Sequence, residues 1–476
     1  MELNPEQCYR AIISRDPRFD GRFFVGVTST GIYCRPVCRS KKPSLVNCKF
    51  FRHAAAAEVA GFRPCLRCRP ELAPGHAPID SGNQLATAAM KQIEAGILSD
   101  QGISGFARRL GVSSRHLRRV FVDNLGVTPI QLVQTRRLLL ARQLLRDTNL
   151  PIIDIAFASG FSSVRRFNAL FLQRYSSAPR QLRQNRRRKI ESSLCVCRLS
   201  YRSPFDWNSL LAFLSQRLFS GVEEVVDGHY RRTVEIGTHR GWISVENQAA
   251  LSSLLVEISV SLLPVLLQVL ARLRRLFDLE AIPEEISSRL GPLARSRPGL
   301  RVPGAFDSFE MAVRAILGQQ ISVKAATTLA ARLTNRFGDS IVTPFPGLTH
   351  LAPQAEVISK IPINQLAAIG ITQARAKSIL ALAQAVSSGT ISFEPAISID
   401  RALAGFKELP GIGNWTAQYF AMRALGWPDA FPESDLGVLK ALRVKSPTQA
   451  TSLAEVWRPW RAYAVMHLWK TLKENP

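Results

Sequence analysis

Four cysteines near the amino terminus form two closely spaced pairs that could hold a metal ion. Three residues separate Cys34 from Cys38, and two separate Cys65 from Cys68. Each pair can place two thiolates on one side of a tight turn, which suits the tetrahedral sulfur ligation of zinc. The spacing therefore predicts one zinc site with four cysteine ligands. A zinc knuckle that only stabilises a small fold would use the same spacing.

Basic residues beside these cysteines and throughout the chain indicate a polyanionic partner. Arg35 and Arg39 flank the first pair and could draw nucleic acid towards the metal. Among 476 residues, 62 Lys and Arg outnumber 36 Asp and Glu, which gives a formal net charge of +26. This excess favours nucleic acid ahead of a membrane surface, although charge alone does not separate the two.

A second group of chemically suggestive residues lies near the C-terminus. Gly411 and Gly413 separate two short helical segments and leave the backbone bare, so loop amides and the next helix N-terminus can approach a phosphate. Asp435 follows where a carboxylate could return to the mouth of this hairpin. Trp415 and Tyr419 lie on one side of the second helix, where an extruded base could stack. Core packing would use the same aromatic residues.

Three other carboxylates compete with Asp435. Asp429 and Glu433 are its neighbours in the sequence, whereas Asp400 fits better as a helix cap.

Two segments between about residues 84 and 182 follow one helix–turn–helix plan. Apolar residues recur at helical spacing on both sides of turns that contain Gly111 and Gly160. Two such copies in one chain favour DNA binding through the major groove, whereas a solvated helix face is the plainer interpretation of their basic residues. The candidate DNA-binding residues are Arg115, Arg118 and Arg119 on the first recognition helix, and Arg165 and Arg166 on the second.

The chain is too long for a single ordinary core and suggests a multidomain protein that is mainly α with α+β parts. We expect a small zinc-binding α/β module at 1–74 and an all-α double helix–turn–helix domain at 84–185. An α+β domain at 194–290 and an all-α hairpin domain at 300–476 should follow.

The sequence favours a reducing cytoplasm. No basic segment followed by an apolar run occurs at the N-terminus, and the apolar stretch 251–270 is interrupted by Glu257, Pro264 and Gln268. The remaining cysteines are irregularly spaced and do not indicate a disulfide framework.

The first 185 or so residues resemble the sensor and regulator half of the Ada family. Residues 155–163 resemble the DNA-binding domain of AraC-type regulators, and the motif Thr30–Pro36 matches the methyl-acceptor motif of Ada proteins. The resemblance implies that Cys34 takes a methyl group from a methylated DNA phosphate, with Cys38, Cys65 and Cys68 as the other zinc ligands. It also implies promoter DNA and RNA polymerase as partners. The Pro-Cys-His-Arg motif of alkylguanine repair is absent from the sequence, so we do not expect that activity.

Residues from about 194 to the C-terminus resemble the helix-hairpin-helix DNA glycosylases of the AlkA type. The resemblance implies excision of alkylated bases such as 3-methyladenine and makes Asp435 the essential carboxylate. Relatives that also cut the strand carry a lysine nucleophile where this chain has Trp415, so we expect no lyase activity. Gln320 stands where AlkA proteins have an apolar wedge that fills the gap left by the flipped base, and this role could move to Ile321.

Together these features predict a DNA repair protein that also regulates transcription, bound to alkylated double-stranded DNA in the nucleoid of a bacterial cytoplasm. Two alternatives remain open. The chain could be a DNA-binding regulator with structural zinc and an inactive domain that reads damage. It could instead be a base-excision enzyme whose zinc site is only structural and whose helix–turn–helix pair merely anchors it to DNA.

Overall fold

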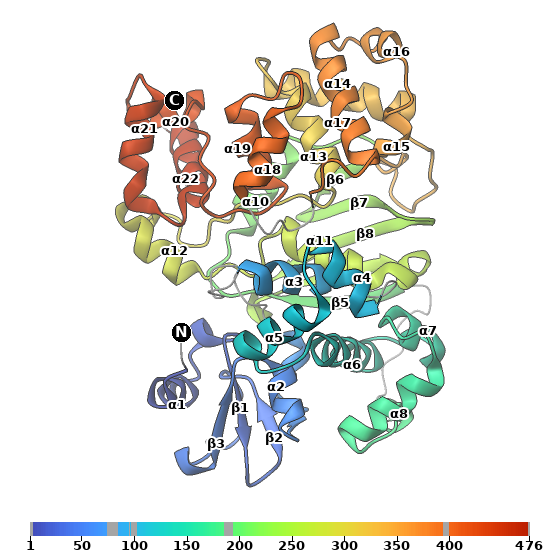
Figure 1. Cartoon of the computed structure of the whole chain (residues 1–476), viewed down its shortest axis with the longest axis vertical. Coiled ribbons are helices and arrows are strands. Elements are labelled where there is room, and N and C mark those ends of the chain that lie inside the picture. The colour runs from blue at the N-terminus through green and yellow to red at the C-terminus, as the bar shows by residue number, and fades with distance from the viewer. Residues whose placement is uncertain are drawn as a thin grey trace. The chain divides into compact units, whose positions relative to one another are not determined.

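The computed structural model describes residues 3–73, 84–94, 96, 102–184, 194–393 and 399–474 (Figure 1). The chain forms two compact units, one of residues 1–203 with 248–271 and one of residues 204–247 with 272–476. Helices predominate in the described residues, with strands in both units, which confirms the expected multidomain, mainly α chain with α+β parts. The expected boundaries at 74 and 185 lie outside the described residues.

The first unit begins with a four-stranded sheet of order β3-β1-β2-β4, covered by short helices. Strands β2 and β4 are parallel and pair Ile32 with Arg63 and Tyr33 with Pro64. Cys34 and Cys65 come next in the two strands, so they lie at the same end of the sheet. These elements are α1 (Pro5–Ser14), η1 (Pro17–Phe19), β1 (Phe24–Val27), β2 (Ile32–Cys34), η2 (Leu45–Asn47), β3 (Cys48–Phe51), α2 (Ala54–Val59), β4 (Arg63–Pro64) and η3 (Pro70–Leu72).

Two helix–turn–helix pairs follow, as the sequence predicted. Gly111 and Gly160 have φ of +70° and +84°, a left-handed conformation that glycine adopts without steric cost. Ser113 and Ser163 cap the second helix of each pair by accepting a backbone N–H. The helices are α3 (Gln84–Glu94), α4 (Gly102–Arg109), α5 (Ser114–Leu125), α6 (Pro129–Asp147), α7 (Ile152–Ala158), α8 (Val164–Tyr175) and α9 (Pro179–Gln184).

Helix α6, between the two pairs, binds the cysteine-containing sheet through a buried arginine. Arg142 is only 2% exposed; its Nη1 donates to Glu71 Oε2 at 3.0 Å and its Nη2 to the Cys65 carbonyl at 2.9 Å. Glu71 also pairs with Arg69, which reaches Asp147 at the end of α6 at 2.8 Å. A buried guanidinium needs such partners to offset its lost hydration.

A second buried contact between α6 and the sheet centres on Glu58. Its carboxylate accepts the Tyr33 hydroxyl at 3.0 Å and the Thr135 hydroxyl at 3.0 Å. Burial raises the pKa of Glu58 to about 7. Two independent polar contacts therefore hold the cysteine module against the helix that joins the two helix–turn–helix pairs.

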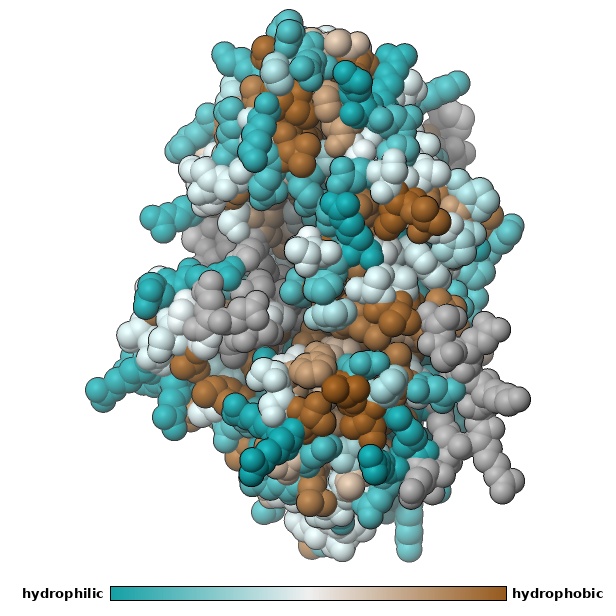
Figure 2. Space-filling view, turned by 90° about the vertical axis from the view of Figure 1, so that its right-hand side faces the viewer, coloured by the Kyte–Doolittle hydropathy of each residue, from teal (hydrophilic) through white to brown (hydrophobic). Residues whose placement is uncertain are grey.

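Two further strands belong to the first unit. Strand β5 (Leu194–Ser200) pairs antiparallel with β9 (Ser253–Ser259). Next to β9 lie η6 (Ala249–Leu251), η7 (Val260–Val265) and α11 (Leu266–Leu276), so the apolar stretch 251–270 is strand followed by helix. In the part of the chain that the structure describes, no helix is both long and apolar enough to span a bilayer. On the face shown in Figure 2, hydrophilic side chains alternate with separate hydrophobic groups.

The second unit combines the antiparallel strands β6, β7 and β8 with a set of helices that surround the glycine hairpin. Helices α13, α17, α18 and α19 pack against one another (yellow to red in Figure 1). The strands are β6 (Glu223–Val226), β7 (His229–Ile236) and β8 (His239–Gln248). The helices are α10 (Trp207–Ser215), α12 (Pro283–Leu290), η8 (Gly291–Ala294), α13 (Ser308–Leu317), α14 (Val323–Phe337), α15 (Ala355–Ile358), α16 (Ile363–Ala368), α17 (Gln373–Ser387), α18 (Ile399–Lys407), α19 (Asn414–Arg423), α20 (Leu436–Leu442), α21 (Pro447–Ala454), η9 (Glu455–Trp457) and α22 (Arg461–Glu474).

The Arg142 contact predicts a selective loss of stability. In Arg142→Met the Cys65 carbonyl loses its donor and Glu71 keeps only Arg69, so we expect the first unit to lose about 3 kcal/mol. All seven tryptophans lie in the second unit. In urea, helical circular dichroism should therefore fall earlier in the variant, while the tryptophan fluorescence transition stays in place.

Arg146→Met is the matched control, because Arg146 lies on the same helix but gives a single exposed hydrogen bond, to the Leu66 carbonyl at 2.8 Å. It should cost about 1 kcal/mol or less. Equal losses in the two variants would contradict the role of Arg142.

Candidate functional site

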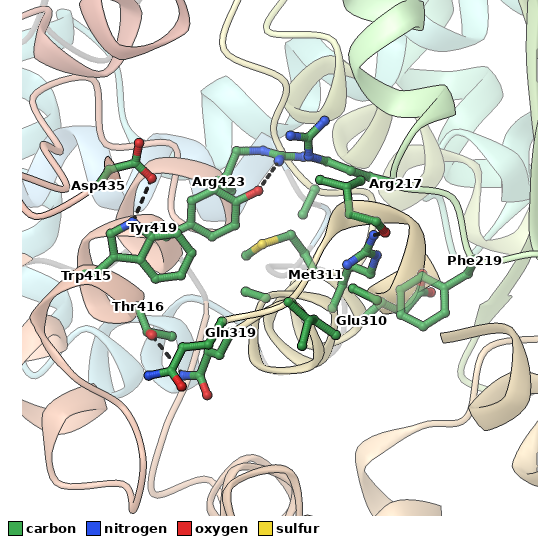
Figure 3. Close-up of a pocket in the computed structure, with 18 of the residues that line it drawn as sticks. Arg217, Phe219, Glu310, Met311, Gln319, Trp415, Thr416, Tyr419, Arg423 and Asp435 are labelled. Atoms are coloured by element: carbon green, nitrogen blue, oxygen red, sulfur yellow. Dashed lines mark hydrogen bonds between the residues drawn. The ribbon is translucent and has the colours of Figure 1, made fainter. Parts of the chain in front are cut away.

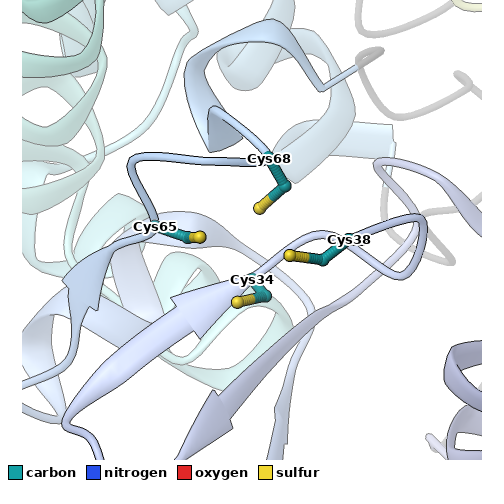
Figure 4. Close-up of side chains that lie close together, drawn as sticks. All are labelled: Cys34, Cys38, Cys65 and Cys68. Atoms are coloured by element: carbon teal, nitrogen blue, oxygen red, sulfur yellow. The ribbon is translucent and has the colours of Figure 1, made fainter. Parts of the chain in front are cut away.

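The four predicted zinc ligands converge in the first unit. The Sγ atoms of Cys34, Cys38, Cys65 and Cys68 all lie within 4.8 Å of one another, and Figure 4 shows them pointing towards a common centre. Tetrahedral zinc with Zn–S bonds of about 2.3 Å requires sulfurs roughly 3.8 Å apart. The cluster therefore fits one zinc ion with a small contraction, and the predicted four-cysteine zinc site is confirmed.

Hydrogen bonds distinguish the four sulfurs. The backbone N–H of Arg35 donates to Cys68 Sγ at 3.3 Å, and Cys38 Sγ lies 3.3 Å from the Ser40 hydroxyl. Cys34 and Cys65 are buried, whereas Cys38 and Cys68 are partly exposed. Hydrogen bonds withdraw charge from a thiolate, so a thiolate at Cys34 or Cys65 would keep more of its charge than one at Cys38 or Cys68, and the methyl-accepting role of Cys34 stays a prediction.

The two arginines beside this site differ in their surroundings. Arg35 is ion-paired with Asp20, its Nε lying 2.8 Å from Oδ1, and its Nη1 donates to the Cys68 carbonyl at 3.2 Å. Arg39 is exposed. The guanidinium of Arg35 thus braces the ligand loop, and DNA contact by either residue stays a prediction.

The arginines of both recognition helices point away from the core. Leu117 and Phe121 on α5, and Phe167 and Phe171 on α8, are buried, which turns the basic faces outward. All five predicted DNA-binding side chains are exposed: Arg115, Arg118, Arg119, Arg165 and Arg166.

In the second unit, Asp435 is held by three N–H donors. It caps α20, where Oδ1 accepts the backbone N–H of Val438 at 2.9 Å. Trp469 Nε1 donates to the same oxygen at 2.8 Å, and Trp415 Nε1 donates to Oδ2 at 2.9 Å. The three donors fix the position of both carboxyl oxygens of Asp435.

Glycine beside Asp435 allows this arrangement. A Cβ on Gly437 would lie 3.0 Å from Asp435 Oδ1 and 3.0 Å from Trp469 Cδ1, too close for the carboxylate and the indole to stay in place. Trp469 carries no local sequence signal, and the sequence analysis missed it.

The rival carboxylates are engaged elsewhere. Asp429 is buried in an ion pair with Arg461 at 2.8 Å, and Glu433 accepts the side-chain amide of Asn414. Asp400 is the second residue of α18, inside the first turn. Only Asp435 among these candidates lines the large cavity of this unit.

This cavity, of about 1400 Å³, contains both predicted aromatic residues. The rings of Trp415 and Tyr419 are stacked, with centroids 5.3 Å apart and planes 7° apart, and Figure 3 shows them beside Asp435. Arg217, Arg314 and Arg423 also line the cavity. The sequence analysis missed these arginines, because segments far apart in the chain supply them.

The glycine hairpin lies at the same cavity. Gly411 has φ of +75°, and a Cβ there would lie 2.3 Å from Ser378 Oγ, so both its conformation and its packing require glycine. A Cβ on Gly413, which precedes α19, would meet nothing within 4 Å. The backbone of the hairpin is thus open to an approaching phosphate.

Gln320 lies in the turn between α13 and α14. It is exposed and has φ of +54°, an uncommon conformation for a residue with a side chain. Its neighbour Gln319 fixes the turn by donating to the Gly411 carbonyl at 3.0 Å and to the Thr416 hydroxyl at 3.1 Å. Which of Gln320 and Ile321 enters DNA stays a prediction.

The fold and the two sites define a multidomain DNA-repair chain in which a four-cysteine metal module and a double helix–turn–helix domain precede a helix-hairpin-helix domain. Family models match four successive stretches. They are the metal binding domain of Ada (residues 7–71), a helix-turn-helix domain (106–185), the AlkA N-terminal domain (196–307) and the HhH-GPD superfamily of base excision DNA repair proteins (313–459).

Similarity to one kind of relative extends over the whole chain. The chain is 39% identical over 486 residues, 99% of this chain and 97% of the relative, to the probable bifunctional transcriptional activator/DNA repair enzyme AlkA of Mycobacterium tuberculosis. It is 37% identical over 273 residues (57% of this chain, 96% of the relative) to DNA-3-methyladenine glycosylase 2 of Escherichia coli. It is 35% identical over 127 residues (27% and 34%) to the bifunctional transcriptional activator/DNA repair enzyme Ada of Escherichia coli.

The chain therefore belongs to the family of bifunctional transcriptional activator/DNA repair AlkA proteins. This confirms the resemblance to an Ada-type regulator fused to an AlkA-type glycosylase.

The zinc site predicts one zinc ion per chain. Cys65→Ser should abolish stoichiometric zinc, because serine is a poor zinc ligand and three thiolates leave the tetrahedron open. Elemental analysis of purified protein measures this directly. Cys48→Ser is the matched control, since Cys48 lies on β3 outside the cluster. Full zinc content in Cys65→Ser would refute the assigned ligand set.

Proposed function

We propose that the second unit excises alkylated purines such as 3-methyladenine from double-stranded DNA by hydrolysis of the N-glycosidic bond. The observation that carries this proposal is the side chain of Asp435, fixed by two indoles and a helix N-terminus beside an aromatic cavity. The extruded base enters beside Trp415 and Tyr419, while the open hairpin at Gly413 and the strained turn at Gln320 engage the backbone.

The chemistry requires little acid catalysis. An alkylated purine already carries positive charge and leaves with the electron pair of the C1′–N bond, so positive charge develops on the sugar. The Asp435 carboxylate stabilises this charge and orients the water that adds to C1′. Trp415 occupies the position of a lyase nucleophile and offers no amine, so the strand stays uncut.

Asp435→Asn should reduce release of 7-methylguanine from a duplex by at least about 10²-fold, since it removes the charge that faces the developing cation. Single-turnover base release measures this, with the unfolding temperature as a check on folding. Glu433→Gln is the matched control, because Glu433 is a nearby carboxylate bonded to Asn414, and it should stay within a few-fold of wild type. An active Asp435→Asn would overturn the assignment.

We further propose that Cys34 accepts a methyl group from a methylated phosphate of DNA. Cys34 lies in the motif Thr30–Pro36, no hydrogen bond from outside the cluster is donated to its sulfur among the described residues, and the module matches the metal binding domain of Ada. Bound zinc would keep the four sulfurs deprotonated at neutral pH. The S–CH3 bond forms as the O–CH3 bond of the phosphotriester breaks, and the phosphate leaves as an ordinary diester anion. None of the described residues near the cluster is expected to remove the methyl group from the thioether sulfur, so each chain reacts once.

The methyl group should appear on one cysteine only. Zinc-loaded protein incubated with DNA that carries methylphosphotriesters, then digested and analysed by mass spectrometry, should show one methyl on the Cys34 peptide and none on Cys38, Cys65 or Cys68. DNA without the modification is the control. Methyl on another ligand, or no adduct, would contradict the assignment.

Methylation of Cys34 also controls how tightly the helix–turn–helix domain binds DNA. Loss of one thiolate charge at Cys34 reduces repulsion between the module and DNA, so methylation tightens binding of the exposed arginines on α5 and α8 to promoter DNA. The DNA-bound protein then recruits RNA polymerase, on nucleoid DNA in a bacterial cytoplasm. We divide the chain into the four domains 1–74, 84–185, 194–290 and 300–476.

A further inference from the structure

The turn between α13 and α14 is joined to the glycine hairpin by hydrogen bonds that the mechanism above does not use. Gln319 Nε2 donates to the Gly411 carbonyl at 3.0 Å and to the Thr416 hydroxyl at 3.1 Å. An amide nitrogen carries two hydrogens, so these contacts use both of them and fix the orientation of the side chain. Figure 3 shows Gln319 beside Thr416. The turn and the hairpin therefore form one connected rim of the cavity, which residues of both segments line.

Helix α17 supports both parts of this rim from one face. Arg375 Nη2 donates to the Gln319 carbonyl. Ser378 lies one helical turn further along α17 and contacts the hairpin at Gly411, where a Cβ would come within 2.3 Å of the Ser378 hydroxyl. The turn, the hairpin and α17 thus make a closed set of contacts, in which Arg375 supports the turn and Ser378 supports the hairpin.

The turn needs this support because its tip is strained. Gln320 has φ of +54°, a conformation that costs a residue with a side chain free energy and that persists only where the surroundings impose it. Gln320 is exposed, Ile321 is partly exposed, and both line the cavity. Gln319, the residue just before the tip, is held at its carbonyl by Arg375 and at its amide by the hairpin. Loss of either contact should let the tip relax.

The position of the tip matters for the cost of extruding a base. A base reaches the cavity only by leaving the stack of the duplex, which costs the energy of its pairing and stacking. A side chain that enters the vacated space recovers part of this energy. The recovery is greatest when the side chain is already in place, because ordering a flexible segment on binding costs free energy of its own.

We propose that Arg375 is a positioning residue for base extrusion. Through the Gln319 carbonyl it holds the strained turn 318–322 against the glycine hairpin, so the tip enters the duplex as the hairpin engages the backbone. Arg375 acts on the step before the glycosidic bond breaks and does not touch the reacting atoms. This inference rests on the proposed glycosylase function.

The test compares two duplexes that carry the same 7-methylguanine. In one the damaged base lies opposite cytosine. In the other it lies opposite an abasic-site analogue, where no base pair has to be broken and extrusion costs less. In single-turnover base release by the full chain, Arg375→Met should lower the rate on the paired duplex, relative to the unpaired duplex, by about tenfold, the effect of losing one hydrogen bond from a charged donor.

Two further variants sharpen the comparison. Gln319→Leu removes the amide contacts with the hairpin without a change of charge, and it should shift the same ratio in the same direction. Lys377→Met removes one positive charge from an exposed position on the same helix, and it should leave the ratio unchanged. The Lys377 variant therefore measures what a basic residue of α17 contributes by attracting phosphate alone.

The outcomes separate the positioning role from the function itself. An unchanged ratio in Arg375→Met would overturn the inference, whether both rates fall together, as they would if Arg375 only supported the fold or bound phosphate, or both stay at the wild-type values. A shift of equal size in Lys377→Met would also overturn it. A wild type that releases 7-methylguanine from neither duplex would instead refute the proposed glycosylase function.

Discussion

The proposed chemistry of the second unit depends on how firmly the side chain of Asp435 is held. Asp435 accepts N–H groups from three helices, α19, α20 and α22. The packing of these helices therefore sets the position of the carboxylate. Gly437 is part of the same arrangement, because a side chain there would displace Asp435 from Trp469.

The first unit also depends on buried charge, which it balances in a different way. The four sulfurs are positioned to bind one zinc ion. The carbonyl of one ligand, Cys65, accepts a guanidinium N–H from Arg142 on α6. Glu71 neutralises that guanidinium. The helix that joins the two DNA-binding motifs is thus bonded directly to a ligand of the metal.

Features that are local in sequence were predictable, whereas features built from distant residues were not. The paired cysteines, the two helix–turn–helix motifs and Asp435 each lie in a short motif whose spacing implies its geometry. Trp469 and Arg423 lie on separate helices and Arg217 lies in the turn after α10. All three line the cavity, and no local spacing in the sequence connects them. The ion pair of Arg35 with Asp20 was likewise not predictable, because the two residues are far apart in the sequence, and DNA contact by Arg35 stays a prediction.

We propose that one chain performs a single methyl transfer and repeated base excision. It is tested most directly by a time course with excess duplex that contains both a methylphosphotriester and 7-methylguanine. The account predicts that methyl on the Cys34 peptide reaches at most one per chain and stops, while free 7-methylguanine continues to accumulate well beyond one per chain. Base release that stops at one equivalent, or methyl transfer that continues past it, would contradict the account.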